Sequence, residues 1–373
     1  MRTLDGDASH PHESRGGTAR RDVRRALRSL AELETGNLPV LSVYLDMRPH
    51  ATGENPAVRA GAVTLRKRLR EIEKTYLPRG PELDSIRADV ERIDRYLEDE
   101  YDVAADGLAL FACAGRGLFE SVEAGAPFED QVTVASQPDL FQLARLVDEH
   151  ETAVVAVVDS NTSRLFATRR GVLHEVGGSD QPPKYFRTRP MMGGLNQASY
   201  QRHNAGLRAQ FARETATELA RLVDAEGASR VVLAGDEVAI PLLQEALSQS
   251  VRALVKDVIR LDIRVPLDAV ADEVKQVLAA AEVEDGKTIA DQLLGAVRAG
   301  GLGVAGLDET RAALEHGQVD ELVLDPAAGL DDTVRGDLVR LAQLTGATVE
   351  IVEGHDGLQR LRGVGALLRY RHD

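Results

Sequence analysis

The chain contains a run of six apolar, mostly β-branched residues, Ala153-Val154-Val155-Ala156-Val157-Val158. A continuous apolar run of this kind predicts a strand that is buried on both faces of a sheet. A second such run, Arg230-Val231-Val232-Leu233-Ala234-Gly235, follows a long amphipathic helical pattern at about 198–224. Buried strands that alternate with helices are typical of an α/β fold. We therefore predict a central α/β domain at 151–265, whose other elements are strands at 163–168, 171–176 and 258–263 and a helix at 238–247.

Residues 20–150 carry the pattern of another α/β domain. Two of its helical patterns are joined by Pro78-Arg79-Gly80-Pro81, a turn short enough for an antiparallel helical hairpin. Residues 1–19 are polar and lack hydrophobic periodicity, which predicts a disordered tail. The predicted elements of this domain are helices around Val23 to Leu30 and at 57–76, 82–101 and 140–147, and strands at 40–45, 107–113, 117–123 and 131–135.

The rest of the chain predicts a helical connection at 266–302 and a third α/β unit at 303–373. We expect the connection to be kinked near Gly286, because a glycine weakens the interior of a helix. Strands alternate with helices in the last unit, which favours a compact α/β/α sandwich. Its predicted elements are helices at 308–316, 331–344 and 358–361 and strands at 319–324, 348–352 and 366–370.

Composition limits the kinds of function to consider. The chain has 373 residues and a formal net charge of -15, and no apolar run approaches the roughly 20 residues that span a bilayer. The N-terminus lacks the apolar core of a secretion signal, so we expect a cytoplasmic protein that has no membrane partner. The single cysteine, Cys113, excludes an internal disulfide and is expected to be buried, and no histidine pair has metal-ligand spacing. We predict a monomer with no metal, no cofactor and no DNA partner.

The segment between the predicted strand at 171–176 and the following helix differs from its acidic surroundings. Residues 177–213 have a net charge of +5, with Asp180 as the single anion. A basic segment in an acidic protein indicates a surface that contacts phosphates. The cations of this segment are Lys184, Arg187, Arg189, Arg202, Arg208 and Arg213.

This basic segment contains the run Gly193-Gly194-Leu195-Asn196-Gln197. Paired glycines allow another molecule to approach the main chain closely, and a neutral carboxamide beside free backbone N–H groups can orient a water molecule or donate to an oxyanion. Hydrolysis of an ester by an oriented water is one chemistry that suits these residues. The alternative is a flexible lead-in to a helix, with Asn196 as its N-cap and the arginines on a solvated face.

The order of these features resembles a known family. The sequence Val157-Val158-Asp159, the basic loop with Gly193 and Gly194, a long helix and the strand at 230–235 resemble the central domain of the archaeal and eukaryotic class I release factor and Pelota superfamily, in its bacterial branch. Residues 303–370 resemble the third domain of that superfamily, which has the fold of the kink-turn-binding ribosomal proteins. The resemblance covers about 150–373, and Ser42-Val43-Tyr44-Leu45-Asp46 is also similar to bacterial members.

The resemblance implies a three-domain protein that enters the ribosomal A site and contacts rRNA and P-site tRNA. In the family, a Gly-Gly-Gln loop promotes hydrolysis of the peptidyl-tRNA ester at the peptidyl-transferase centre. Gly193 and Gly194 match the two glycines, whereas Gln197 comes two residues later than the glutamine of the family. The first domain lacks the Asn-Ile-Lys-Ser motif with which release factors decode stop codons, so we predict no stop-codon decoding.

We therefore expect a ribosome-associated factor that rescues stalled ribosomes as a peptidyl-tRNA hydrolase, with Gly193, Gly194 and Gln197 as catalytic residues. A hibernation factor, which occupies the A site without catalysis, is the alternative that the displaced glutamine favours. A third reading, a nuclease-like enzyme that uses Asp159, lacks an accompanying carboxylate cluster. The predicted RNA-binding residues are Lys184, Arg187, Arg189, Tyr200, Arg202, His203 and Arg208.

The last unit suggests a further partner. Residues 303–373 hold 13 acidic and 7 basic side chains, a net charge of -6. This charge argues against a general RNA binder and favours a basic surface, such as that of a ribosomal protein or a translational GTPase.

Overall fold

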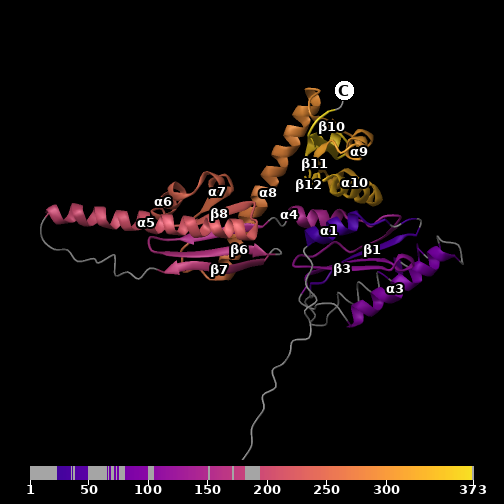
Figure 1. The fold of residues 1–373 in the computed structure, drawn as a ribbon, viewed down its shortest axis with the longest axis horizontal. Coiled ribbons are helices and arrows are strands. Elements are labelled where there is room, and N and C mark those ends of the chain that lie inside the picture. The colour runs from indigo at the N-terminus through magenta and orange to yellow at the C-terminus, as the bar shows by residue number, and fades with distance from the viewer. Residues whose placement is uncertain are drawn as a thin grey trace, which may run out of the picture.

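The computed structural model describes residues 23–48 except 35 and 37, a few positions between 65 and 74, and residues 80–99, 105–149, 152–169, 172–180 and 194–371; between 194 and 201 it describes the backbone alone. The described residues form a mixed α/β structure with three sheets, which confirms the predicted fold class at this level (Figure 1). We call the three parts the N-terminal body (23–149), the central body (152–265) and the C-terminal body (303–371). Among the described residues, no helix is both long enough and apolar enough to cross a membrane.

The sheet of the N-terminal body has the order β3-β2-β1-β4, and all of its neighbouring strands are antiparallel. Successive side chains of a strand point to opposite faces, and helices cover both faces. Tyr44 and Phe111 belong to the core on the side of α1 and α4, whereas Val43 and Leu110 belong to the core on the side of α3. The elements are α1 (Val23–Ala31), β1 (Val40–Asp46), α3 (Pro81–Asp99), β2 (Gly107–Cys113), β3 (Leu118–Ala124), β4 (Gln131–Ala135) and α4 (Phe141–Glu149).

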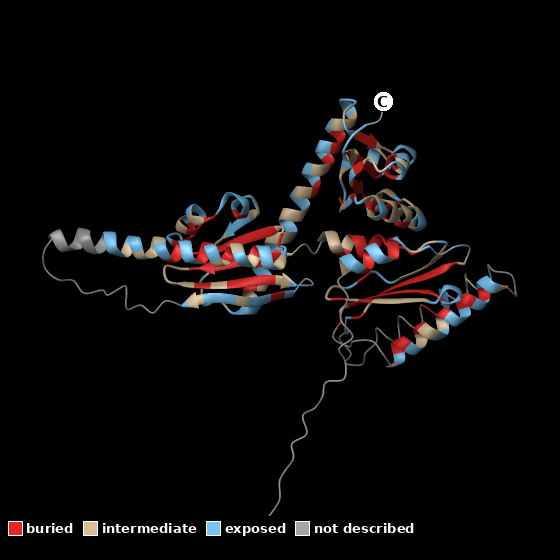
Figure 2. Ribbon diagram, in the orientation of Figure 1, coloured by how far each residue is buried: buried red, intermediate tan, exposed pale blue. Residues whose placement is uncertain are grey.

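The central body contains a five-stranded sheet of order β7-β6-β5-β8-β9. Strands β5, β8 and β9 are parallel, and β6 and β7 extend the sheet as an antiparallel hairpin. Every residue of β5 and β8 is buried, as their apolar runs predict, because helices lie on both faces (Figure 2). The elements are β5 (Ala153–Val158), β6 (Thr162–Arg169), β7 (Val172–Asp180), α5 (Gly194–Glu226), β8 (Arg230–Gly235), α6 (Ala239–Ala246), α7 (Gln249–Ala253) and β9 (Val255–Ile259).

The C-terminal body has a four-stranded sheet of order β10-β13-β11-β12. Helices α9 and α10 contribute to the core on one face, and the second half of α8 with α11 contributes to the core on the other, so the sheet has helices on both faces as expected. The elements are α8 (Leu267–Arg298), β10 (Gly303–Ala305), α9 (Leu307–Glu315), β11 (Val319–Leu324), α10 (Asp332–Thr345), β12 (Thr348–Ile351), α11 (Asp356–Arg360) and β13 (Val364–Leu368).

Helix α8 joins the central body to the C-terminal body. Val270 and Val274, in its first half, are buried in the core beneath the central sheet, and Leu293, in its second half, is buried in the core of the C-terminal body. The expected kink does not break the helix, which runs continuously through Gly286. A Cβ at Gly286 would lie 3.4 Å from Val352 Cγ2, an ordinary van der Waals distance, so the packing of this position does not require a glycine.

Several predicted bounds differ from those in the structure, and one strand was missed. We expected the last strand of the central sheet at 258–263, but β9 begins at Val255, directly after the short helix α7. Its pattern is hard to read in sequence because β9 is an edge strand whose central residues are exposed. We also missed β10, whose three residues are too few to show a period. The predicted tail at 1–19, and most of the predicted helix at 57–76, lie outside the described residues.

Candidate functional site

The predicted site lies at the beginning of α5. Lys184, Arg187, Arg189 and Gly193 are outside the described residues, and for Gly194, Gln197 and Tyr200 the structure gives the backbone alone. We expected the helix to begin near Ala198, and the alternative interpretation made Asn196 its N-cap. It begins at Gly194, so Asn196 and Gln197 are within the helix.

Helix α5 extends well beyond the sheet on which it packs. It has 33 residues, and among its described side chains the first buried one is that of Phe211. From Gly194 to Phe211 the helix rises about 25 Å at the usual 1.5 Å per residue. Figure 1 shows this part projecting beyond the central sheet, and the residues from Arg202 to Gln210 are exposed or half-buried. We call residues 194–210 the overhang.

The second half of α5 anchors the overhang. Phe211, Ala216 and Leu219 are buried against the central body, with exposed fractions of 5% or less. A helix that is packed along one half keeps its free half in a defined direction, because the hydrogen-bond ladder is continuous. The central sheet therefore supports the second half of α5, and the helix places the backbone of Gly194 and Gln197 well beyond the edge of that sheet.

Charge along α5 is separated between its two halves. From Gly194 to Arg213 the helix has three arginines and no acidic residue, whereas from Glu214 to Glu226 it has four acidic residues and one arginine. There is no acidic side chain in the first turn to offset the positive end of the helix dipole. The overhang is therefore the positive part of α5 and would attract phosphates.

The described RNA-binding candidates have different environments. Arg202 and His203 are exposed on the overhang. Arg208 is only partly exposed, and it lines a small cavity between α5 and α6 together with Asp159 and Thr215. At about 10 Å³ this cavity is close to the smallest that holds one water molecule, so it is too small for a nucleotide.

Asp159 behaves as a turn residue. Its Oδ1 accepts hydrogen bonds from the backbone N–H groups of Asn161 and Thr162, at 2.8 and 2.6 Å. This geometry closes the turn between β5 and β6, which agrees with the usual role of an aspartate at the end of a strand. The nuclease-like reading therefore gains no support from this residue.

The described residues contain one group of carboxylates close enough together to hold a cation. Asp148, Glu282 and Glu350 each place an oxygen within 4.8 Å of the others. They come from α4, α8 and β12, which meet where the three bodies adjoin. Glu282 already pairs with Arg230 at 2.5 Å. We assign no ion to this group, because acidic side chains commonly gather without one.

Sequence reasoning missed the overhang as a structural feature. The helical pattern predicted α5, but it could not show how much of the helix is covered by the sheet. A usable signal was present in the change of composition at Phe211, where buried apolar residues begin to recur on one face. Before that residue, the described side chains are exposed or half-buried.

The central body and its overhang match a known protein family. Residues 138–283 match the sequence model of a family described as bacterial archaeo-eukaryotic release factor family 10. The matched range begins just before α4 and ends within α8, so it includes the central sheet and the whole of α5. This match to the family model confirms the resemblance over these residues. No curated protein matches the sequence.

Several solved structures are similar in fold. Ribosome-bound archaeal Pelota is 18% identical, with a TM-score of 0.45, over 69% of this chain and 73% of its own. Dom34 of S. cerevisiae, a translation termination-like factor, is 11% identical, with a TM-score of 0.44, over 68% of this chain and 73% of its own. An archaeal translation termination factor is 16% identical over 93% of this chain and 97% of its own, with a TM-score of 0.26.

Proposed function

We propose that this protein is a cytoplasmic, ribosome-associated translation factor that enters the A site with the overhang of α5 leading. The observation that supports this function best is the overhang, a positive helix about 25 Å long that begins at Gly194. A thin basic rod suits a channel lined with RNA, since phosphates attract it and no wide body blocks its path. The family match at 138–283 includes the overhang.

The first candidate activity is rescue of stalled ribosomes by hydrolysis of the peptidyl-tRNA ester. Gly193 and Gly194 would let RNA approach the main chain closely, and the carboxamide of Gln197 would orient the attacking water. The basic residues Lys184, Arg187, Arg189 and Arg202 would contact rRNA or the tRNA acceptor end. In this role the protein would be a peptidyl-tRNA hydrolase that does not decode stop codons.

The second candidate activity is hibernation, in which the overhang occupies the A site and shields the peptidyl-transferase centre. One observation favours it: the helix begins at Gly194, so Gln197 lies on a helical backbone rather than in an extended loop. A helical residue has its position fixed by its neighbours and adapts less to a reacting ester. Occupancy needs the shape and charge of the overhang but not the position of one amide.

The same experiment tests both candidates. The full-length protein is added to purified stalled ribosomes that carry a labelled nascent peptide, and binding and peptide release are measured together. Hydrolysis predicts release that falls at least a hundredfold in Gln197→Ala while binding is kept. The matched control is Gln210→Ala, an exposed glutamine near the base of the overhang. Binding without release supports occupancy, and a protein that binds no ribosome contradicts both candidates.

We also infer a basic partner for the acidic C-terminal body. Its helix α9 exposes Asp308, Glu309 and Glu315. Clustered exposed carboxylates favour a positively charged protein surface and disfavour RNA. A ribosomal protein or a translational GTPase would fit. Cross-linking of ribosome-bound protein, with Asp308→Lys together with Glu309→Lys as the variant, tests this contact by the loss of one cross-linked partner.

A further inference from the structure

The N-terminal and C-terminal bodies share one apolar core. A single cluster of buried residues includes Leu27 and Leu30 of α1 together with Leu338, Val339 and Ala342 of α10. These five side chains have exposed fractions of 2% or less. Helix α1 packs on α10, and α4 packs on both α10 and β12 (Figure 1). Residues from opposite ends of the chain therefore fill the same interior.

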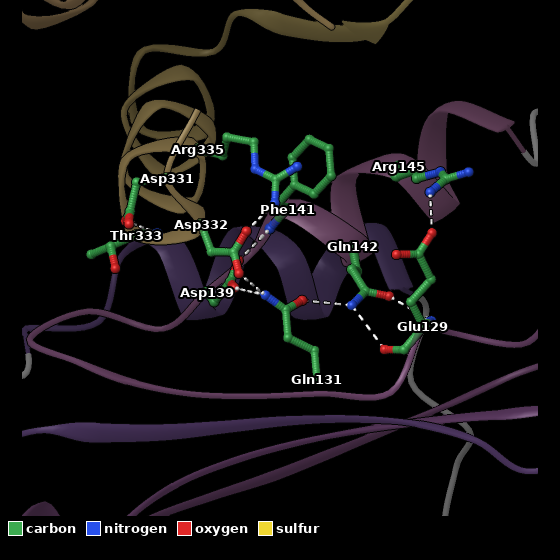
Figure 3. Close-up of polar contacts among 10 residues, drawn as sticks. All are labelled: Glu129, Gln131, Asp139, Phe141, Gln142, Arg145, Asp331, Asp332, Thr333 and Arg335. Carbon is green, nitrogen blue, oxygen red and sulfur yellow. Dashed lines mark hydrogen bonds and ion pairs between the residues drawn. The ribbon is translucent and has the colours of Figure 1, made fainter. Parts of the chain in front are cut away.

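A polar seam lies beside this core, and it is drawn in Figure 3. Gln131 Nε2, in the N-terminal body, donates to Asp332 Oδ2 of α10 at 2.8 Å and to Asp139 Oδ2 at 3.3 Å. Gln142 Nε2 donates to Gln131 Oε1 at 2.7 Å, which fixes the direction of the Gln131 amide. Each polar group of the Gln131 amide thus has a partner, and this half-buried network favours one arrangement of the two bodies.

Charged side chains extend the seam. The guanidinium of Arg335, which pairs with Asp332, lies 4.4 Å from the centre of the Phe141 ring. On the other side, Arg145 of α4 pairs with Glu353, which follows β12, at 3.0 Å. Contacts of this kind add geometric specificity to the apolar contact.

Gly336 lets α10 approach the N-terminal body. A Cβ at this position would lie 3.1 Å from Asp139 Oδ1 and 3.3 Å from Asp139 Cα. The second contact is with the main chain, which cannot rotate away as a side chain can. A side chain at position 336 would therefore need α10 and the main chain at Asp139 to move apart by a few tenths of an ångström.

The N-terminal body also covers an edge of the C-terminal sheet. Strand β12 lies at that edge, and an uncovered edge strand offers unpaired backbone groups to other chains. The carboxylate of Asp148 on α4 accepts the N–H of Ile351 at 2.8 Å. The C-terminal body thus leaves a backbone donor for the N-terminal body to satisfy.

From these contacts we infer that the N-terminal and C-terminal bodies form one cooperative unit, which the central body and α8 interrupt in the chain. The face of α10 is covered inside this unit, so a partner of the C-terminal body must bind elsewhere, for example on α9. The chain then consists of two mechanical parts, the shared unit and the central body with its overhang. This inference does not depend on the proposed function.

Hydrogen exchange on the full-length protein tests the inference, because residues of one cooperative unit open together. The variant is Gly336→Ala, and its matched control is Gly295→Ala, at a helical glycine whose added Cβ would meet no atom within 4 Å. We expect Gly336→Ala to lower the protection of amides in α1, α4 and α10 by a similar factor, at least tenfold, and to leave β5 and β8 unchanged. The control has no such clash, and because alanine favours a helix over glycine, it should leave these amides as protected as in the wild type or more so.

A second variant, in the N-terminal body, tests whether a change there affects the C-terminal body. Gln131→Ala, in the N-terminal body, should lower the protection of α10 and β12 in the C-terminal body by at least threefold. If Gly336→Ala fails to fold, Gln131→Ala alone tests the inference. The inference is overturned if each variant loosens its own body alone, or if neither variant changes protection across the seam.

Discussion

The carboxylate of Asp148 accepts a hydrogen bond of 2.8 Å from the backbone N–H of Ile351, although 203 residues separate the two in the chain. Asp148 lies at the end of a helix of the N-terminal body, and Ile351 ends the edge strand of the C-terminal sheet. A buried backbone donor that loses its acceptor keeps the full cost of leaving water. The stability of the C-terminal body thus depends in part on the side chain of Asp148, which belongs to the N-terminal body.

Replacement of Asp148 should reveal this dependence. In Asp148→Ala the Ile351 N–H loses its acceptor, so we expect the free energy of unfolding of the C-terminal body to fall by about 1 to 3 kcal/mol. Asp148→Asn keeps an acceptor oxygen and removes a charge near Glu282 and Glu350, so it should be as stable as the wild type or more so. Urea unfolding, with hydrogen exchange at Ile351, measures both; equal stability of the alanine variant and the wild type would contradict the role of this bond.

The stability of the N-terminal body should depend on the pH through Asp89. Burial raises the pKa of this carboxyl to about 7, although its Oδ1 accepts a hydrogen bond of 2.6 Å from the N–H of Ala114. The unfolded chain loses this proton near pH 4, so between about pH 4 and 7 the folded state binds more protons. The free energy of unfolding should therefore fall as the pH rises through that window and level off above it.

Asp89→Asn tests this dependence. The asparagine keeps an acceptor for Ala114 but does not ionise, so we expect a smaller slope between about pH 4 and 7 and a gain of about 1 to 3 kcal/mol at about pH 8. The control is Glu91→Gln, at an exposed position of the same helix. Unfolding measured across the pH range should show the wild-type slope in the control; a slope that persists in Asp89→Asn would assign it to another group.

The anchoring of α5 should change abruptly along the helix. Phe211 is 5% exposed and lies against the central body, so Phe211→Ala should destabilise that body by about 3 to 5 kcal/mol. Leu207, one turn earlier, is only half-buried, and Leu207→Ala should cost at most about 1 kcal/mol. The measurement is the opening free energy of β5 and β8 from hydrogen exchange. Similar costs at the two positions would mean that the base of the helix begins earlier than Phe211.

Ribosome binding should depend on charge in the overhang rather than on charge at its base. We expect Arg202→Glu to weaken co-sedimentation with ribosomes at least tenfold and to reduce its salt dependence. Arg221→Glu, at an exposed position over the sheet, should leave binding close to that of the wild type. Equal losses in the two variants would point to the total charge of the protein rather than to the overhang.

Most of the fold could be predicted from local patterns. The runs at 153–158 and 230–235 predicted β5 and β8 with the bounds that these strands have in the structure, because strands that are buried on both faces leave a continuous apolar signature. The pattern failed at β9, an edge strand with exposed residues, and at β10, which has only three. The kink expected at Gly286 does not break α8, since the helix is packed into a core on each side of that residue.

The candidate site shows the same division. Gly193, Gly194, Gln197 and the surrounding arginines could be selected from charge and residue type, and the family match at 138–283 includes them. The extent of the overhang could not be predicted from the sequence, because it depends on where the sheet stops supporting α5. The contacts of Gln131 with Asp332 and of Asp148 with Ile351 were equally out of reach, since they join residues 201 and 203 positions apart.

The sequence by itself thus determined the secondary structure of most elements and the position of a basic, glycine-containing segment in an acidic chain. These properties are local, since hydrophobic period, turn residues and charge are carried by neighbouring residues. The tertiary structure alone decided that α5 projects beyond its sheet and that the N-terminal and C-terminal bodies pack into one core. Both depend on which surfaces meet, and that is set by the shapes of bodies assembled from distant segments rather than by any local pattern.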